Sequence, residues 1–294
     1  MFPEVFRGRD HSTDSTPKIR RTWSSAVLSV SALAASVLVL LLSSCAKGGG
    51  PGSSGSGSST PAVAVTGNWE FQATASKGTP PFSSLAGYLH ESGSGTSEFV
   101  TAAVQAQSDS CYANLANISL TGSVNGAQVI VTSIPVDSQV LSLNLQANSS
   151  VTQLAGNYSV TGGCAAGVSG SLTGQKSALV DGTYSGALTN DVSRSMSLNL
   201  TQYQDGTGDG GYQTSGTATF TNDSCFSQGT LAAQNGTVIG NAVSLTFTTN
   251  DAAGAQVVMT GTIDTSADTL TLTSIEVNKG SCPGALGPAT LHLQ

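Results

Sequence analysis

Charged side chains are scarce in this chain of 294 residues, where Asp, Glu, Lys and Arg together make up 9%. Aromatic residues contribute 5%, and only 3 histidines are present. The few basic residues provide no concentrated cationic face for phosphate groups, which excludes nucleic acids and anionic lipid surfaces as main partners. The few histidines leave little from which a catalytic or metal-binding cluster could be built. We therefore expect a protein that is not an enzyme and uses no cofactor.

A sustained helical period is also missing from the chain after residue 60. Apolar and hydroxyl-bearing residues alternate there with a period of two, which is typical of antiparallel strands with one buried and one wet face. The clearest segments are 129–132, 141–145, 196–200, 243–247 and 270–273. Turn signals that accept positive φ lie between such segments. They are Asn125-Gly126, Asp181-Gly182, Asp205-Gly206, Asp209-Gly210 and Asn235-Gly236. The pattern predicts an all-β fold.

A basic stretch and a long uncharged run stand at the start of the chain. Lys18, Arg20 and Arg21 precede an uncharged run that ends in Leu42-Ser43-Ser44-Cys45. A basic head, an apolar core and small residues before a cleavage point are the parts of a secretory signal. The last four residues resemble the lipobox of bacterial lipoproteins. This resemblance implies that residues 1–44 are removed and that Cys45 receives diacylglycerol, which makes membrane lipid a partner of the chain.

Other interpretations of this segment stay open. Ser24 to Leu42 is 19 residues, close to the length of about 20 that spans the hydrocarbon layer as an uncleaved helix. Arg20-Arg21 is a weak twin-arginine signal, so the export route is either of the two general ones. Ala46 after the cysteine resembles the outer-membrane sorting pattern of lipoproteins, and it predicts an envelope location facing the periplasm or the cell surface.

Composition divides the rest of the chain. Residues 45–60 are rich in Gly and Ser and predict a flexible tether behind the lipidated cysteine. Removing residues 1–44 takes away 5 of the 10 basic and 3 of the 17 acidic residues, which leaves a formal charge of −9. We expect two β domains after the tether, at 61–178 and 179–294.

These two domains are predicted from an internal duplication. Asp109-Ser110-Cys111-Tyr112 recurs 114 residues later as Asp223-Ser224-Cys225-Phe226. At the same offset, residues 126–132 match residues 240–246 with the apolar alternation in register. Each half opens with Gly-x-aromatic, as Gly67-Asn68-Trp69 and as Gly182-Thr183-Tyr184. Matches of several kinds at one period indicate a repeat.

About eight strand-like segments fit into each half. Eight antiparallel strands close most economically into an up-and-down barrel, although a two-sheet sandwich would use the same pattern. The Gly67-Asn68-Trp69 start followed by hairpin-linked strands resembles the lipocalin and avidin group of small barrels. Biotin binding of the avidin kind is not implied, because it needs several tryptophans and only Trp69 remains after residue 44. We expect Trp69 to be a core residue.

Four cysteines follow Cys45, with two in each repeat. Three pairings are possible, and only Cys111 with Cys164 and Cys225 with Cys282 respects the duplication. An oxidising compartment permits such bridges, which agrees with export. In the chain-entropy model, a bridge that closes a loop of this length stabilises the folded domain by about 4 kcal/mol. A metal site is the alternative, but two separated cysteines per domain with no nearby histidine form a poor ligand set.

The remaining candidates for chemistry are weak. His90 and Glu91 are adjacent, so on a strand they point to opposite faces and cannot serve one reacting atom. Asp205 and Asp209 stand in a Gly-rich loop that offers oxygens to Ca²⁺, yet Asp-Gly pairs are also what tight turns require. The sequence leads us to expect no catalytic residues and no metal site.

Two functions fit this chain. The first is a noncatalytic structural or interaction role in the cell envelope, with the hydroxyl-rich outer faces meeting envelope components. The second is binding of a small, mostly apolar molecule inside one barrel. Large inward side chains favour the first, whereas small inward side chains would leave a cavity for the second. Residues 100–104 and 252–255 are rich in alanine, and their orientation decides what they contribute.

Overall fold

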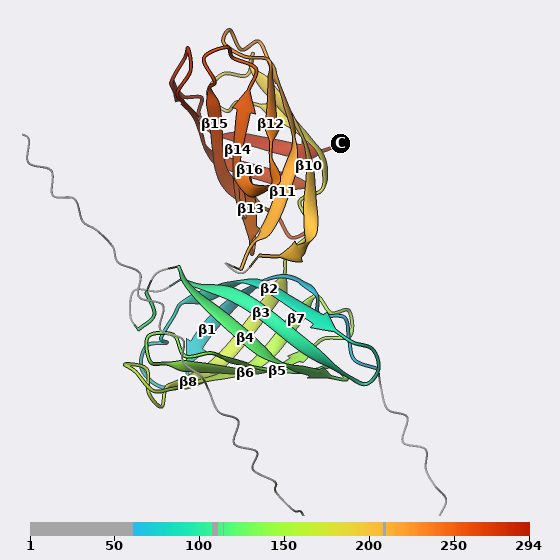
Figure 1. The fold of residues 1–294 in the computed structure, drawn as a ribbon, viewed down its shortest axis with the longest axis vertical. Coiled ribbons are helices and arrows are strands. Elements are labelled where there is room, and N and C mark those ends of the chain that lie inside the picture. Colours follow the sequence, from blue (N-terminus) through green and yellow to red (C-terminus); the bar gives the residue numbers. More distant parts are fainter. Residues whose placement is uncertain (1–60, 108–110, 114, 208–209) are drawn as a thin grey trace, which may run out of the picture. The chain divides into compact units, whose positions relative to one another are not determined.

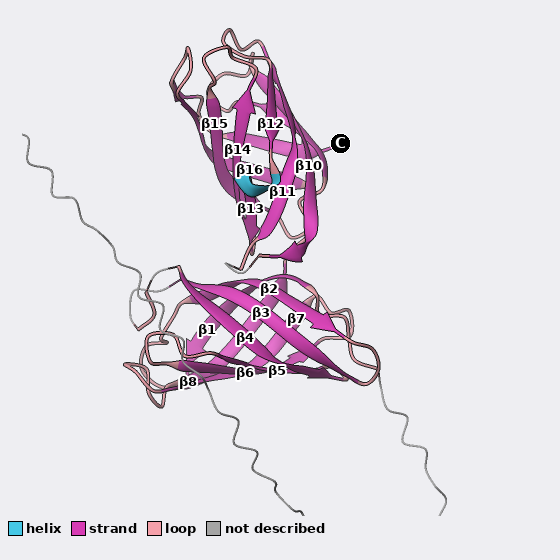
Figure 2. Cartoon of the chain, viewed as in Figure 1, coloured by secondary structure: helices cyan, strands magenta, loops and turns pink. Residues whose placement is uncertain are grey.

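The computed structural model describes residues 61–107, 111–113, 115–207 and 210–294. Strands and loops make up this part of the chain, apart from one 3₁₀ turn at Ala233–Asn235 (Figure 2). The predicted all-β class is therefore confirmed. In the described residues, no helix is long and apolar enough to cross a bilayer.

The first eight strands close into an antiparallel barrel, which we call barrel 1 (Figure 1). They are β1 (Gly67–Ala75), β2 (Ser84–Ser92), β3 (Ser97–Gln107), β4 (Ala116–Asn125), β5 (Gln128–Ser133), β6 (Val140–Ala147), β7 (Gln153–Thr161) and β8 (Ser169–Lys176). Each strand pairs with the next one, and β8 returns to pair with β1. The barrel, and not the sandwich, is the architecture that forms.

The remaining strands form barrel 2, which has the same order of strands. They are β9 (Gly182–Ala187), β10 (Ser195–Gly206), β11 (Tyr212–Thr221), β12 (Gln228–Leu231), β13 (Gly236–Ile239), β14 (Ala242–Thr249), β15 (Gln256–Ile263), β16 (Thr269–Asn278), β17 (Gly284–Ala285) and β18 (Ala289–Leu293). β12 and β13 both lie between β11 and β14, so they share one position in the barrel. Pairings β18–β9 and β10–β11 close the ring.

The turn signals met two different outcomes. Asn125-Gly126 forms the tight β4–β5 turn, with Gly126 at φ 56°. Asn235-Gly236 does not form a turn with positive φ, since Gly236 has φ −124°, and that expectation was wrong. Asn235 ends the 3₁₀ turn that interrupts one strand position between β12 and β13. The dipeptide permits a reversal of the chain but does not enforce one, because β14 pairs with both pieces.

Large buried side chains occupy the interiors of both barrels. Trp69, Phe71, Phe82 and Tyr158 are at most 1% exposed in barrel 1, which has its own core cluster. Barrel 2 has a separate core that includes the fully buried Tyr184 together with Phe247, leucines, valines and two methionines. Burial of each large apolar side chain contributes about 1.5–3 kcal/mol, so each barrel carries its own stabilising core.

The alanine-rich segments now have an orientation. In β3, Val100, Ala102 and Val104 face the interior of barrel 1 among the large side chains. Residues 252–254 form an exposed turn between β14 and β15, and Ala255 is buried in the core of barrel 2. Neither segment therefore lines an interior made only of small residues.

Glycine is required where neighbouring strands coil tightly. A Cβ on Gly122 of β4 would overlap the backbone oxygen of Ile130 on β5. A Cβ on Gly261 of β15 would overlap the backbone oxygen of Thr271, beside an irregularity in the β15–β16 register. Glycines of this kind let a sheet bend sharply enough to close.

Both predicted disulfides form. Cys111 in the β3–β4 connection is bonded to Cys164 in the β7–β8 connection, with a Cα–Cα distance of 5.7 Å. Cys225 in the β11–β12 connection is bonded to Cys282 after β16, with a Cα–Cα distance of 6.2 Å. The two bridges therefore join equivalent connections, as the duplication requires.

Candidate functional site

Two of the predicted sites lie outside the described residues. Cys45, the predicted lipid attachment site, belongs to the segment 1–60. Asp209 is also outside them, and for Asp205 the structure describes the backbone at the end of β10 but not the side chain. The lipid anchor and the weak calcium candidate therefore stay predictions.

The histidines do not come together with partners for catalysis. His90 is exposed on the outside of barrel 1, while the adjacent Glu91 is half-buried on the opposite face of β2. His292 is exposed on β18 of barrel 2. Among the described residues, no three His, Cys, Asp or Glu side chains lie close enough to hold a metal ion.

Strand register arranges the outer side chains of barrel 1 into rows. One row has a serine or threonine on each of six successive strands, all exposed or half-buried. Its members are Thr101, Thr121, Thr132, Ser142, Ser159 and Ser169. Within it, the hydroxyls of Thr132 and Ser142 are 3.3 Å apart. We call these six residues the hydroxyl row of barrel 1.

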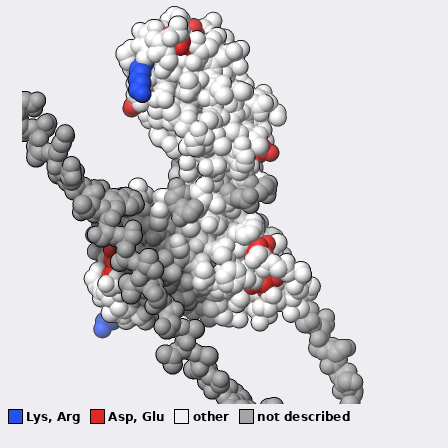
Figure 3. Space-filling view, in the orientation of Figure 1, with Lys and Arg blue, Asp and Glu red and all other residues white. Residues whose placement is uncertain are grey.

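Barrel 2 repeats this arrangement with a mixed row of hydroxyls and amides. Seven strand positions contribute one outward polar residue each. The members are Thr183, Asn199, Thr217, Thr230, Thr248, Gln256 and Asn278. The face of the described surface that Figure 3 shows is mostly neither Lys, Arg, Asp nor Glu. Both barrels therefore present outer walls that are mostly uncharged and hydrogen-bonding.

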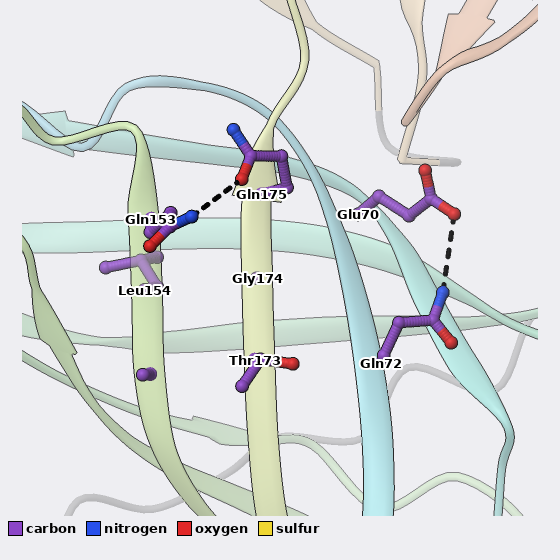
Figure 4. A pocket seen from close by; sticks show the side chains of 8 residues that line it. Glu70, Gln72, Gln153, Leu154, Thr173, Gly174 and Gln175 are labelled. Carbon is purple, nitrogen blue, oxygen red and sulfur yellow. Dashed lines mark hydrogen bonds between the residues drawn. The ribbon is translucent and has the colours of Figure 1, made fainter. Parts of the chain in front are cut away.

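A groove of about 370 Å³ crosses the outer wall of barrel 1 over β7, β8 and β1 (Figure 4). Its floor includes the backbone at Leu154 and Gly174. We call the six outward residues of its lining the glutamine groove. They are Glu70, Gln72, Gln153, Ala155, Thr173 and Gln175. Short Ala155 and Thr173 lie beside longer side chains, and this difference in length hollows the wall.

Two hydrogen bonds hold the amides of the glutamine groove. The Nε2 atom of Gln153 donates to Oε1 of Gln175 at 3.3 Å, across the β7–β8 pair. The Nε2 atom of Gln72 donates to Oε1 of Glu70 at 3.4 Å, along β1. In Figure 4 the first pair joins two neighbouring strands, and the second pair lies along one strand of the same wall. Because amides both donate and accept, the groove still offers both kinds of group to a bound molecule.

Barrel 2 has a groove of similar size but of other chemistry. It measures about 380 Å³ and lies on the outer wall over β13, β14, β15 and β16. Its outward lining consists of hydroxyl and small or aliphatic side chains. They are Thr237, Ile239, Ala242, Ser244, Thr260, Thr262 and Thr273. We call it the threonine groove, and its lining contains no amide and no charged side chain.

The end of barrel 1 where β1 begins carries a small polar cluster. The Nε1 atom of Trp69 donates to the backbone oxygen of Val65 at 2.9 Å, and the Lys176 ammonium lies 5.7 Å from the Trp69 ring centre. Burial lowers the pKa of Lys176, and the Glu91 carboxylate partly offsets that change. The Oε2 atom of Glu91 is buried and has no hydrogen-bond partner among the described residues. Trp69 is thus a core residue, as predicted.

Barrel 2 has neutral residues at the equivalent positions. Tyr184 replaces Trp69, and its strand partner Leu293 replaces Lys176. Gln202 stands two residues after the partner of Gly182, as Glu91 stands two residues after the partner of Gly67. The Oε1 atom of Gln202 accepts from the backbone N–H of Val180 at 3.0 Å. Its Nε2 atom and the Oγ1 atom of its strand partner Thr214 are buried without partners among the described residues.

Two tyrosine hydroxyls are buried in the core of barrel 1. Tyr112 and Tyr158 both pack against Phe82, with ring centres 6.0 and 5.2 Å from it. Neither hydroxyl has a hydrogen-bond partner among the described residues. Burial, with a smaller effect of the Asp137 carboxylate, raises the pKa of Tyr112 to about 12. Burial also raises the pKa of Tyr158.

The sequence did not single out the glutamine groove or the barrel ends. The period of two correctly assigns Gln153 and Gln175 to the outer face, but only the β7–β8 register makes them neighbours. Likewise, Glu91 and Lys176 are far apart in the chain, and barrel closure brings them to one end. A register prediction for each hairpin would have been the signal needed to find both sets.

Comparisons of this chain with protein-family models, with curated proteins and with solved structures found no match. The described residues therefore define only an architecture. It is a tandem pair of closed β-barrels, each with eight strand positions and one disulfide. The likeness to lipocalins and avidins stays a resemblance in strand pattern.

Proposed function

We propose that this chain is a lipid-anchored lipoprotein of a bacterial cell envelope with a noncatalytic interaction role. In this proposal Cys45 carries the lipid in the outer membrane, residues 46–60 are the tether, and the two barrels contact envelope components. The observation that carries the proposal is the combination of interiors occupied by large buried side chains with mostly uncharged polar outer walls, because a barrel packed in this way acts through its outside.

The rival function is binding of a small apolar molecule inside a barrel. A cavity for such a ligand needs inward residues that leave space. The inward residues here are large, with Trp69 and Phe71 in barrel 1 and Tyr184 and Phe247 in barrel 2 all fully buried. This packing supports the interaction role over the ligand-carrier role.

Mass spectrometry of the full chain, extracted from host membranes in detergent, tests this proposal. We expect an intact mass that lacks residues 1–44, carries a diacylglyceryl group at Cys45 and contains two disulfides. Under native conditions we expect no small molecule bound to the protein. Membrane-extracted protein that retains Met1 would contradict the anchor, and a stoichiometric small apolar molecule would favour the rival function.

A further inference from the structure

The amides of the glutamine groove have unused hydrogen-bonding capacity. The bond between Gln153 and Gln175 uses one N–H of Gln153 and one acceptor of Gln175. Among the described residues, the side-chain Oε1 atom of Gln153 and the Nε2 atom of Gln175 make no hydrogen bond, whereas the backbone oxygen of Gln153 accepts one from Asn148. Each amide therefore presents a donor or an acceptor to a molecule lying in the groove. Sugar hydroxyls are matched to such pairs because each one both donates and accepts.

The register gives these groups a fixed spacing. Gln153, Gln175 and Glu70 form one row across β7, β8 and β1. Neighbouring strands are about 4.8 Å apart, which is close to the length of one hexose ring in a polysaccharide. Groups carried by paired strands are held more rigidly than groups on loops. The row can therefore contact successive sugar units of one chain.

The charge of the groove argues against other ligand classes. Its lining contains one carboxylate, Glu70, and no Lys or Arg, so phosphate and other anions are repelled. A single carboxylate is a poor site for a divalent cation. Ala155 is the only outward apolar side chain of the lining, which gives an apolar ligand little surface to bury.

Strand addition by a peptide is also disfavoured at this place. A peptide that binds by strand addition needs an open sheet edge. The groove crosses β7, β8 and β1, and each of these strands is paired on both sides. A ligand must therefore use side chains that project from the wall, which suits a chain rich in hydroxyls.

We infer that the glutamine groove of barrel 1 binds a segment of a neutral polysaccharide of the envelope. This inference rests on the proposed function and names the partner class for it. The threonine groove of barrel 2 is an internal comparison, because it is of similar size but offers hydroxyls without amides or a carboxylate.

Affinity electrophoresis of the full chain in detergent tests the inference. The gels contain polysaccharide extracted from the host envelope and separated by ion exchange into neutral and anionic fractions. We expect the neutral fraction to retard the wild-type chain. Gln153→Ala with Gln175→Ala should weaken retardation about tenfold, equivalent to ~1.4 kcal/mol. Thr237→Ala with Thr260→Ala in the threonine groove should leave it unchanged.

A conservative variant separates hydrogen bonding from folding. Glu70→Gln keeps the size of the side chain and an acceptor oxygen, so we expect it to bind the neutral fraction within about threefold of wild type. Circular dichroism checks that each variant keeps the strand content of the wild-type chain. Equal retardation of wild type and the Gln153/Gln175 variant, or retardation by the anionic fraction alone, would overturn the inference.

Sedimentation with lipid-free envelope fragments separates this inference from the proposed function. If the wild-type chain sediments with the fragments but the neutral polysaccharide does not retard it, the glutamine groove is the wrong site or the ligand is of another class, and the envelope role stands. If the wild-type chain does not sediment with the fragments, the envelope interaction itself fails.

Discussion

Barrels 1 and 2 share strand order and disulfide positions but differ at the end where the first strand begins. Barrel 1 has Trp69, Lys176 and Glu91 there, and barrel 2 has Tyr184, Leu293 and Gln202 at the equivalent positions. The strand partner of Glu91 is Val100, and that of Gln202 is Thr214. The comparison teaches that the barrel requires a large inward aromatic residue near its end but tolerates either charged or neutral neighbours.

Loss of a disulfide should have the largest effect, and it should be confined to one barrel. We expect Cys111→Ala with Cys164→Ala to lower the free energy of unfolding of barrel 1 by about 4 kcal/mol, because the bridge closes a long loop. Urea denaturation of the processed chain, followed by Trp69 fluorescence, reports barrel 1, since Trp23 belongs to the predicted signal.

The matched control is Cys225→Ala with Cys282→Ala in barrel 2. It should leave the Trp69 transition in place and shift the transition seen by circular dichroism. If both double variants shifted the Trp69 transition equally, the barrels would not be independent folding units.

Replacing Val100 and Thr214 each by the residue type of the other barrel should have the next largest effect, with opposite signs of the change in stability. We expect Val100→Thr to destabilise barrel 1 by about 1 kcal/mol, because it buries a hydroxyl whose available acceptor is the Glu91 carboxylate on the paired strand. Thr214→Val should stabilise barrel 2 by about 1 kcal/mol, since the Thr214 hydroxyl is buried without a partner among the described residues. Denaturation curves of both variants measure the two changes. Destabilisation by Thr214→Val would show that its hydroxyl has a bound water or other partner.

Alkaline pH should weaken barrel 1 through Tyr112. Its pKa is raised from 10.0 to about 12 in the folded chain, so the unfolded chain loses this proton first. The stabilising effect of the neutral hydroxyl is complete below pH 10 and is lost as the pH rises from 10 to about 12. We expect Tyr112→Phe to reduce this alkaline loss, measured by Trp69 fluorescence at fixed urea. An unchanged alkaline profile in the variant would contradict the assignment to Tyr112.

Replacement of Lys176 by leucine, the residue at the equivalent position of barrel 2, should have the smallest effect on the free energy of unfolding. Lys176→Leu removes a half-buried ammonium together with its contact to Trp69, and the two effects offset each other to within ~1 kcal/mol at neutral pH. The lowered pKa of Lys176 means that wild-type stability rises with pH from that lowered pKa up to about 10.5. In the variant this rise should be absent from denaturation curves. If the stability of the variant rose with pH by the same amount as that of the wild type, another group would be responsible for the rise.

The sequence could predict the features that depend on local pattern. The alternation in 141–145 and 243–247 placed strands β6 and β14, and the two cysteines per repeat predicted both bridges. The positive-φ turn expected at Asn235-Gly236 was wrong because strand pairing on both sides of β13 overrode the local turn preference. The choice between barrel and sandwich depended on the β1–β8 pairing, which no local segment encodes.

The candidate site was less accessible to prediction for the same reason. Gln153 and Gln175 belong to different strands, and their contact depends on hairpin register. A shift of one residue in either strand would have turned the glutamine of that strand inward. The prediction of a lipid site at Cys45, by contrast, uses the linear sequence alone and does not depend on strand register.

In each barrel the first and last strands lie side by side, as Trp69 with Lys176 and Tyr184 with Leu293 show. The polypeptide therefore enters and leaves each barrel through the same wall, and a connector of only five residues, 177–181, separates β8 from β9. Under these conditions a copied gene segment can be appended without threading one module through another. This geometry explains how an ancestral single module could have become two, and it predicts that further copies could be joined in the same way.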